Sequence, residues 1–499
     1  MSVHWPIIRR CLRRPLEVAA IDDRRAYKRL EILWGALALA SEIDRVSRSR
    51  TVGVMLPTSG GTPMALLAGW MLGRVVVPLN YLLKPEELKF VVEDCGADAI
   101  VTAQPLLEHM GLGKDGAVLP GAGAALGGAR VIRVEDVDFK TPPEPRWPAL
   151  AGEDDLACLL YTSGTSGKPK GVMLTHGNLR ANIRQIVEWV NFTDREVLLG
   201  VLPQFHSFGL TVLTLMPLTI GCKVVYTARF VPQRIVKLMR EHRPTAYIAI
   251  PSMFNAMLHV KDAGPEDFSS LKYPVSGGEP LPEAVSRGFR ERFGVTIAEG
   301  YGLTETSPVT NWCRPQEYRA RSVGRALPGV RERIVSVETG RDVGPDEDGE
   351  VRISGPNVMR GYFRRPEETR AAFDAEGWFR TGDIGRMDAE GHLYITGRLK
   401  EMLIVGGENV FPREIEEALN AHESVKDSGV VGKVDPIRGE LPVAFIELRE
   451  GAAFDERALT TWCRARLAGY KVPTEIRVVE ALPRNATGKV MRRELKKMA

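Results

Sequence analysis

Short β-rich segments alternate with longer amphipathic segments over much of this 499-residue chain, and this alternation constrains the fold more than any other feature. Residues 51–77 follow the order strand, helix, strand, and residues 223–250 repeat that order. Strands that alternate with helices form parallel sheets covered by helices. We therefore predict two βαβ blocks, at residues 30–120 and 180–300.

The pattern changes after residue 320, where short β-rich segments are separated by Gly, Pro and Asp turns. Strands are expected at residues 333–337, 349–353 and 392–395, and they suit a small β-barrel or a meander. A compact α+β block is expected from residue 400 onwards. The predicted fold class is therefore α/β plus α+β. A large N-terminal domain contains two βαβ-layered subdomains and a small β-barrel, and a small α+β domain follows it.

Composition and charge argue against several classes of protein. Apolar residues make up 44% of the chain, which is enough for large buried cores. The net charge of +4 is small for this length and argues against a nucleic-acid-binding protein. The six cysteines form no CxxC pair, so neither a disulfide framework nor a zinc site is expected. The expected location is the cytoplasm.

Two uncharged stretches, residues 51–73 and 197–222, are long enough to raise the question of a membrane-spanning helix. Both are interrupted by prolines and other helix-breaking or polar residues. A spanning helix needs about 20 continuous apolar residues, so each stretch is predicted to form a buried strand, a loop and a buried helix. The pairs Arg9-Arg10 and Arg13-Arg14 allow at most peripheral contact with an anionic membrane, and a solvated helix face is the favoured interpretation.

The strongest local signal is the segment 160–171, with the sequence LYTSGTSGKPKG. Its glycines and small hydroxyl residues let the backbone approach a polyphosphate closely, and Lys168 and Lys170 add positive charge. It differs from a Walker A loop in the spacing of its glycines and in the proline that follows Lys168. A flexible surface loop is the alternative, but phosphate binding is the better interpretation.

Five further motifs follow this segment along the chain. They are SGGEPL (276–281), GYGLTET (300–306), GWFRTGD (377–383), GRLKEMLIVGGEN (397–409) and NATGK (485–489). With the first segment they resemble, in order, the motifs of the adenylate-forming superfamily, which includes acyl-CoA synthetases, peptide-synthetase adenylation domains and beetle luciferases. The resemblance covers residues 161–489, and residues 78–102 also resemble the family's N-terminal region.

The resemblance implies an AMP-forming acid–thiol ligase that uses ATP, Mg²⁺ and coenzyme A. A carboxylate attacks the α-phosphorus of ATP, pyrophosphate leaves, and the acyl group then passes from AMP to coenzyme A. The carboxylate is already ionised at neutral pH, so the protein supplies position and charge rather than a general base. The expected partners are a carboxylic acid, ATP and coenzyme A, without nucleic acid, and a homodimer is compatible with this reading.

The resemblance also assigns the nucleotide contacts residue by residue. Asp383 would accept hydrogen bonds from the ribose hydroxyls, and Arg398 would complete that clamp. Glu305 and Thr162 would bind Mg²⁺, which prefers oxygen ligands, with Thr304 nearby. Taken singly, these charged groups would be interpreted as solvated surface residues. The phosphate-binding residues would be Thr162, Ser163, Gly164, Thr165, Ser166, Gly167, Lys168 and Lys170, and the adenine site would comprise Gly277, Gly278, Glu279, Glu299, Gly300, Tyr301, Gly302 and Thr304.

The C-terminal motifs imply a moving domain. Lys489 would neutralise the repulsion between the substrate carboxylate and the α-phosphate. Rotation about the hinge residue Lys400 would then exchange the Lys489 loop for a loop that admits the pantetheine arm of coenzyme A. The implied domains are residues 1–397 and 398–499. The coenzyme A loop would contain Gly406, Gly407 and Asn409, and the residues expected to act in catalysis are Lys489, Glu305, Thr162 and His206.

His206 lies in the segment QFHSFGL, residues 204–210, which corresponds to the family's substrate gate. Relatives that activate amino acids place an aspartate there to pair with the ammonium group, a role that an imidazole cannot fill. Phe208 and the apolar run up to Met216 suggest a hydrophobic pocket. A medium- or long-chain fatty acid is therefore the first choice of substrate and an aromatic acid the second. The alternatives are a buried structural role for His206, a ligase that loads a carrier protein, and a nucleotide-binding scaffold without turnover.

Overall fold

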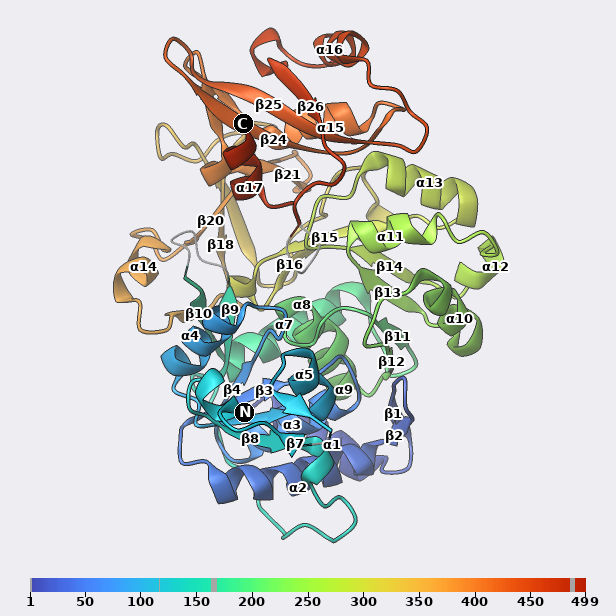
Figure 1. The fold of residues 1–499 in the computed structure, drawn as a ribbon, viewed down its shortest axis with the longest axis vertical. Coiled ribbons are helices and arrows are strands. Elements are labelled where there is room, and N and C mark those ends of the chain that lie inside the picture. The colour runs from blue at the N-terminus through green and yellow to red at the C-terminus, as the bar shows by residue number, and fades with distance from the viewer. Residues whose placement is uncertain (1, 116, 163–167, 485–489) are drawn as a thin grey trace.

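The computed structural model describes residues 2–115, 117–162, 168–484 and 490–499 (Figure 1). Two large, mainly parallel sheets form most of the N-terminal part of the chain. A four-stranded sheet follows, and a five-stranded sheet forms the C-terminal part, which lies at one end of the molecule's long axis. The predicted α/β plus α+β organisation is confirmed.

The seven-stranded sheet has the order β19-β10-β9-β4-β3-β5-β8. Strands β4, β3, β5 and β8 pair in parallel, and β10 and β19 continue the sheet antiparallel. The strands are β3 (Thr51–Met55), β4 (Val75–Pro78), β5 (Ala99–Thr102), β8 (Arg130–Arg133), β9 (Leu156–Thr162), β10 (Lys170–Thr175) and β19 (Gly361–Tyr362). The helices in this part are α2 (Arg29–Val46), α3 (Gly61–Met71), α4 (Pro85–Cys95), α5 (Gln104–His109) and α6 (Ala122–Ala125).

Both faces of this sheet are buried. Val76 of β4 belongs to the main core, whereas Val75 and Val77 belong to a second cluster that includes Leu88 of α4. Successive side chains of a strand point to opposite faces, so a strand covered on both sides is apolar along its whole length. The continuous apolar runs at residues 51–56 and 75–77 have this cause.

The eight-stranded sheet has the order β16-β15-β14-β13-β11-β12-β1-β2, with antiparallel pairs only at its two ends. The strands are β1 (Val18–Ile21), β2 (Ala26–Lys28), β11 (Val197–Gly200), β12 (Lys223–Tyr226), β13 (Ala246–Ala249), β14 (Tyr273–Ser276), β15 (Ala298–Gly302) and β16 (Val309–Trp312). The helical segments are α1 (His4–Arg13), α7 (His176–Val190), α8 (Ser207–Leu210), the π-helical turn η2 (Thr211–Leu215), α9 (Met216–Ile220), α10 (Pro232–His242), α11 (Pro251–Met257), α12 (Pro265–Phe268) and α13 (Glu283–Phe293).

The predicted small β-barrel is wrong. The four-stranded sheet is an open antiparallel meander in the order β17-β18-β20-β21. Closure into a barrel needs enough tilted strands for the last strand to pair with the first, and four strands do not provide them here. The strands are β17 (Arg331–Val335), β18 (Gly349–Ser354), β20 (Phe379–Met387) and β21 (Leu393–Arg398), and α14 (Pro366–Ala371) precedes β20.

The C-terminal part has hydrophobic clusters of its own. Val430 and Ala444 face one cluster together with Ile415 of α15, and Val431 and Val443 face another together with Leu495 of α17. The five-stranded sheet has the order β23-β22-β25-β24, with β26 paired to β25. Its elements are β22 (Leu403–Val405), β23 (Glu408–Val410), α15 (Pro412–Asn420), β24 (Val425–Asp435), β25 (Gly439–Leu448), α16 (Glu456–Arg464), β26 (Glu475–Val478) and α17 (Arg492–Met498).

Helix α1 packs its apolar side, including Ile7 and Ile8, into the main core. Arg10 and Arg14 lie 3.6 Å and 3.3 Å from the carboxylate of Asp194, so two of the four arginines considered for membrane contact have an acidic partner. Among the described residues, no helix is both long and apolar enough to cross a membrane. The two uncharged stretches are instead strand, loop and helix, as predicted.

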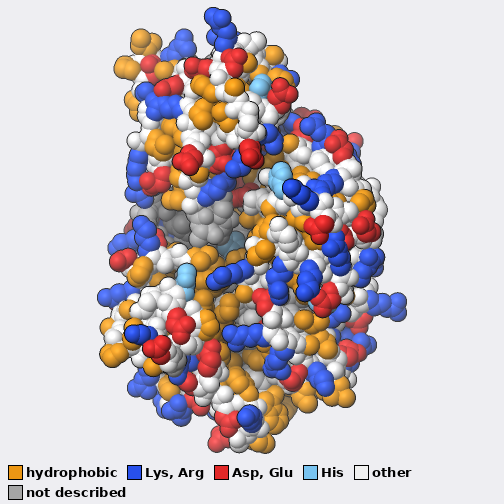
Figure 2. Space-filling model, turned by 45° about the vertical axis from the view of Figure 1, so that its right-hand side comes forward, with side chains coloured by type: hydrophobic (Ala, Val, Ile, Leu, Met, Phe, Trp, Pro, Cys, Tyr) orange, Lys and Arg blue, Asp and Glu red, His pale blue; other side chains and the backbone are white. Residues whose placement is uncertain are grey.

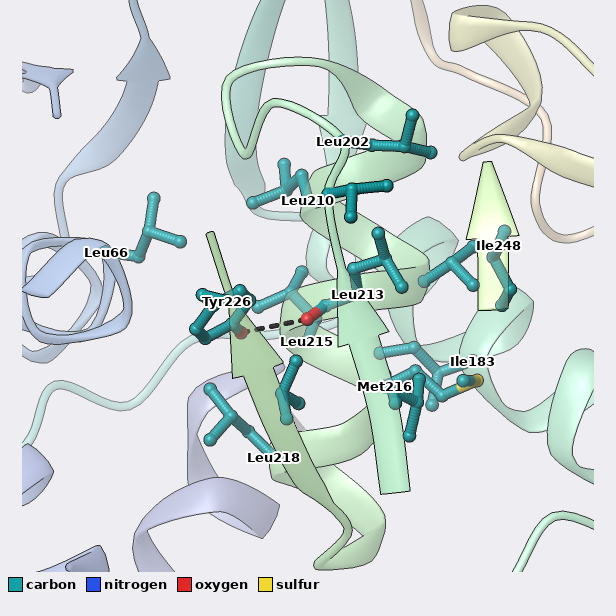
Figure 3. Packing of buried hydrophobic residues seen from close by; sticks show 14 of the residues in the cluster. Leu66, Ile183, Leu202, Leu210, Leu213, Leu215, Met216, Leu218, Tyr226 and Ile248 are labelled. Atoms are coloured by element: carbon teal, nitrogen blue, oxygen red, sulfur yellow. Dashed lines mark hydrogen bonds between the residues drawn. The ribbon is translucent and has the colours of Figure 1, made fainter. Parts of the chain in front are cut away.

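The apolar run that follows His206 is part of the core. Leu210, Leu213, Leu215 and Met216 are at most 1% exposed. Figure 3 shows them packed among Leu66, Ile183, Leu218, Tyr226 and Ile248 from the surrounding helices and strands, with the Tyr226 hydroxyl donating to the carbonyl oxygen of Leu213 at 2.8 Å. The sequence-based assignment of this run to an acyl pocket therefore does not hold for these side chains.

Replacing Leu215 with alanine should lower the free energy of unfolding by about 2–5 kcal/mol, because it leaves a cavity in a close-packed core. Leu12, which is 61% exposed, provides the control, and its replacement with alanine should change stability little. Urea denaturation of both variants measures the difference. If the Leu215 variant kept its stability but bound the acid more weakly, Leu215 would belong to the wall of the acyl pocket and not to the core.

Candidate active site

The carboxyl ends of the parallel strands β11, β13, β14 and β15 share one edge of the eight-stranded sheet. Ligands of open α/β sheets bind outside this edge. His206 follows β11, Gly277 and Gly278 follow β14, and Glu305 follows β15. The topology therefore brings together motifs that are about a hundred residues apart in sequence. Figure 2 shows the surface hollowed where the C-terminal part meets the rest of the molecule.

Asp383 joins this edge to the four-stranded sheet. It lies on β20 opposite Arg398 of β21, and Arg398 Nε is 2.7 Å from Asp383 Oδ1. The hydroxyl of Tyr301, on β15, donates to Asp383 Oδ2 at 2.7 Å. Asp383 is only 2% exposed, and its charge is the main reason that the pKa of Arg398 is raised. The structure thus brings together the predicted ribose pair and Tyr301.

Glu305 offers a carboxylate a short distance beyond Tyr301 along the chain. Its Oε1 accepts a hydrogen bond from the hydroxyl of Tyr362 at 2.9 Å. Burial raises the pKa of its carboxyl group. The described residues contain no cluster of three His, Cys, Asp or Glu side chains that could hold a metal by themselves. One carboxylate with hydroxyl groups nearby is the oxygen donor set that fits Mg²⁺, which is commonly bound through one or two carboxylates, nucleotide phosphates and water.

The described end of the phosphate motif lies beside Glu305. Thr162 and Lys170 are paired across β9 and β10. Lys170 Nζ lies 5.4 Å from the centre of the Tyr362 ring, so Tyr362 connects Lys170 to Glu305. Lys168 Nζ lies 5.5 Å from the ring centre of Phe90 on α4. The predicted phosphate residues Ser163, Gly164, Thr165, Ser166 and Gly167 lie outside the described residues, as does Lys489.

Sequence reasoning missed Tyr362. It belongs to no quoted motif and stands almost sixty residues after Glu305. The available signal was the isolated pair Gly361-Tyr362 between two β-rich segments, which form β18 and β20. Nothing in the spacing indicates that this pair becomes the edge strand next to β10.

His206 is exposed, not buried in the core, and desolvation by the surrounding protein lowers the pKa of its imidazole. The next residue, Ser207, contacts Thr304 through their hydroxyls at 3.2 Å, which ties the loop of His206 to the loop of Glu305. Phe208 packs against Gly277, where an added Cβ would lie 3.0 Å from the ring. The buried structural role considered for His206 is therefore not observed, and the side chain is available to a ligand.

The predicted adenine residues line the same sheet edge. Gly278 has a φ of 83°, a left-handed conformation that favours glycine. A side chain on Gly302 would collide with the carbonyl oxygen of Pro308, and Gly300 pairs with Trp312 across β15 and β16. Glu299 is 9% exposed, and burial raises the pKa of its carboxyl group to about 7, partly opposed by Arg413 of α15. Glu279 lies close enough to Arg484 for their charges to interact.

The predicted coenzyme A loop lies elsewhere in this structure. Gly406 and Gly407 form the turn between β22 and β23, with open space around both and φ values of 61° and 91°. Asn409 pairs with Ile404 in the same hairpin and is exposed. Lys400 lies between β21 and β22, and desolvation, followed by the charge of Arg398, lowers its pKa. The structure therefore places Lys400 near the residues predicted to bind the nucleotide, whereas the Gly406-Gly407 turn is exposed.

Comparison with known proteins identifies the family. The AMP-binding enzyme family matches residues 9–363, and the AMP-binding enzyme C-terminal domain matches residues 414–489. The chain is 35% identical to a long-chain-fatty-acid–CoA ligase of Bacillus subtilis (strain 168), over 93% of this chain and 89% of that protein. It is 34% identical to a feruloyl-CoA synthase of an Amycolatopsis species, over 99% of this chain and 98% of that protein.

Solved structures agree with this result. ATP-bound MatB from Rhodopseudomonas palustris has a TM-score of 0.90 and 29% identity, covering 100% of this chain and 99% of that chain. The o-succinylbenzoate coenzyme A synthetase of Bacillus subtilis, in complex with ATP and a magnesium ion, has a TM-score of 0.85 and 30% identity, covering 98% and 99%. The chain therefore belongs to the AMP-binding enzymes of the adenylate-forming superfamily, as an AMP-forming acid–thiol ligase of the acyl-CoA synthetase type.

Proposed function

We propose that this enzyme converts a hydrophobic carboxylic acid to its acyl-AMP and then transfers the acyl group to coenzyme A. The first choice of acid is a medium- or long-chain fatty acid. The observation that carries the adenylation step is the Tyr301–Asp383–Arg398 group beside Glu305 and Lys170. Its charges and hydrogen-bonding groups match the ribose and polyphosphate of ATP. The 35% identity to a long-chain-fatty-acid–CoA ligase supports the choice of acid.

In the first step, the acid's carboxylate forms a bond to the α-phosphorus, and the bond from that phosphorus to pyrophosphate breaks. Asp383 accepts hydrogen bonds from the ribose hydroxyls, and Arg398 keeps Asp383 in place. Together they fix the nucleoside end of ATP. Lys168 and Lys170 offset the negative charge of the leaving pyrophosphate. A bound Mg²⁺, held by Glu305 and Thr162, would neutralise further phosphate charge. Positioning and charge neutralisation carry this reaction without a general base.

In the second step, the thiol of coenzyme A attacks the acyl carbonyl, and AMP leaves. We propose that the C-terminal domain, residues 398–499, rotates about Lys400 to bring the Gly406-Gly407 turn to the cleft. The short connection between β21 and β22 supports this hinge, because it is the link between the two parts of the chain. The open space around both glycines supports the passage of a narrow pantetheine arm. The six cysteines, all free and buried, fit a reducing cytoplasm.

An aromatic acid is the second candidate. The rings of Tyr81 and Phe205 meet edge to face with centroids 5.0 Å apart, next to His206, and Phe208 follows two residues later. Aromatic side chains favour such contacts with a planar ring. The 34% identity to a feruloyl-CoA synthase over nearly the whole chain supports this alternative.

ATP–pyrophosphate exchange with a panel of acids tests the function. Exchange should require a carboxylic acid and should be fastest with fatty acids of medium or long chain. Faster exchange with cinnamates or benzoates would select the aromatic alternative. ATP binding without exchange for any acid would favour a scaffold without turnover, and thioester formation on a carrier protein but not on coenzyme A would contradict the second step.

Replacing Lys489 with alanine should reduce adenylate formation strongly and spare thioester formation from supplied acyl-AMP, because the lysine is assigned only to the first step. Pyrophosphate exchange measures the first half-reaction, and acyl-CoA release from synthetic acyl-AMP measures the second. Equal losses in both would contradict this division of labour.

Replacing Asp383 with asparagine should lower kcat/KM for ATP about 10–100-fold, mainly through KM, because a charge-assisted contact to ribose and the partner of Arg398 are lost. Asp388 is the control, since it is another aspartate paired with an arginine: its side chain is 10% exposed, and its carboxylate lies 2.7 Å from Arg319. Its replacement with asparagine should leave the KM for ATP unchanged. Similar KM changes in the two variants would argue against the ribose assignment.

A further inference from the structure

We propose that Tyr362 is a positioning residue that aligns Glu305 for the metal ion and seats Lys170 for the nucleotide phosphates. The inference rests on the proposed ATP-dependent function and adds a residue to it. Tyr362 lies on the two-residue strand β19, at the outer edge of the seven-stranded sheet. From there its side chain contacts both groups: the hydroxyl reaches Glu305, and the ring lies under Lys170.

Two hydrogen bonds hold Glu305 against this segment. The hydroxyl of Tyr362 donates to Glu305 Oε1 at 2.9 Å, and the backbone N–H of Met359 donates to the carbonyl oxygen of Glu305 at 2.7 Å. Main chain and side chain of Glu305 are therefore fixed by the same short segment. The side-chain contact engages one carboxylate oxygen, Oε1, and so sets the direction in which the Glu305 carboxylate points.

The segment that carries Tyr362 is itself fixed. Tyr362 pairs with Val172 of β10, and the N–H of Phe363 donates to the carbonyl oxygen of Gly171 at 2.7 Å. The N–H of Tyr362 donates to the hydroxyl of Thr369 at 2.8 Å. These bonds fix the backbone from which the tyrosine side chain reaches Glu305. A precisely held partner of a metal-binding carboxylate sets the direction in which that carboxylate points.

Lys170 uses the other face of the same side chain. Its Nζ lies 5.4 Å from the ring centre and 3.8 Å from the carboxylate of Glu368 on α14. A cation over a tyrosine ring is attracted by the ring's electron density. The ring thus sets the spacing between a phosphate-binding ammonium group and a metal-binding carboxylate. A tyrosine that served only the edge of the sheet would need neither contact.

Two substitutions separate these contacts. Tyr362→Phe removes the hydroxyl and keeps the ring, and Tyr362→Leu removes both. Tyr394→Phe is the matched control, because the Tyr394 hydroxyl also donates to a carboxylate, Asp388 Oδ2 at 3.3 Å, away from the nucleotide groups. Mn²⁺ binding in the presence of α,β-methylene-ATP, followed by electron paramagnetic resonance, reports metal affinity without turnover. Thermal unfolding of each variant checks that the fold is intact.

For Tyr362→Phe we expect the Mn²⁺ dissociation constant to rise about 10–100-fold, the usual effect of losing a partner that orients a metal ligand. Affinity for the analogue at saturating Mn²⁺ should stay within about twofold of the wild type, and Tyr394→Phe should match the wild type in both. Tyr362→Leu should add a loss of analogue affinity of about fivefold, through Lys170. Unchanged Mn²⁺ affinity in Tyr362→Phe would overturn the role at Glu305, and equal analogue affinity in the two Tyr362 variants would overturn the role at Lys170.

The same experiment distinguishes this inference from the proposed function. A wild-type enzyme that binds no Mn²⁺ together with the analogue would contradict the proposed function itself, before any variant is compared. A wild type that binds both, and a Tyr362→Phe variant that binds them equally well, would refute the inference alone.

Discussion

The buried carboxylate of Asp383 is the constraint on which the rest of the site depends. At 2% exposure, an ionised carboxylate without partners would be strongly destabilising, so Tyr301 and Arg398 are needed at 2.7 Å each. The three residues come from β15, β20 and β21, and the contact therefore fixes the four-stranded sheet against the eight-stranded one. Lys400 follows Arg398 by two residues, which places the proposed hinge directly beside the proposed clamp for ribose.

Much of this arrangement could be predicted from the sequence, because strand–helix alternation determines parallel pairing and parallel pairing collects the strand ends at one edge. The family resemblance was the reason to expect Asp383, Arg398 and Glu305 at a shared site. Tyr362 could not be predicted, because its role depends on β19 joining β10 across almost two hundred residues. The run from Leu210 to Met216 illustrates another limit, since an apolar sequence suits a pocket wall and a packed core equally well.

The two half-reactions make opposite demands on the C-terminal part. Adenylation requires the groups for ATP to be enclosed, and here Arg484 approaches Glu279 while Lys400 lies near the nucleotide residues. Thioester formation requires a path for a thiol, and the Gly406-Gly407 turn is exposed in this structure. A single rigid arrangement serves one demand at a time. The proposed rotation at the short link between β21 and β22 would meet both demands, and the separate hydrophobic clusters of the C-terminal sheet support it.

The central claim is that a carboxylate oxygen of the acid forms a bond to the α-phosphorus of ATP within this cleft. The most direct test supplies the acid with both carboxylate oxygens labelled as ¹⁸O, together with ATP and coenzyme A, and measures the products by mass spectrometry. The account predicts one ¹⁸O atom in AMP and one in the thioester. Label in inorganic phosphate with formation of ADP, or unlabelled AMP beside the thioester product, would contradict it.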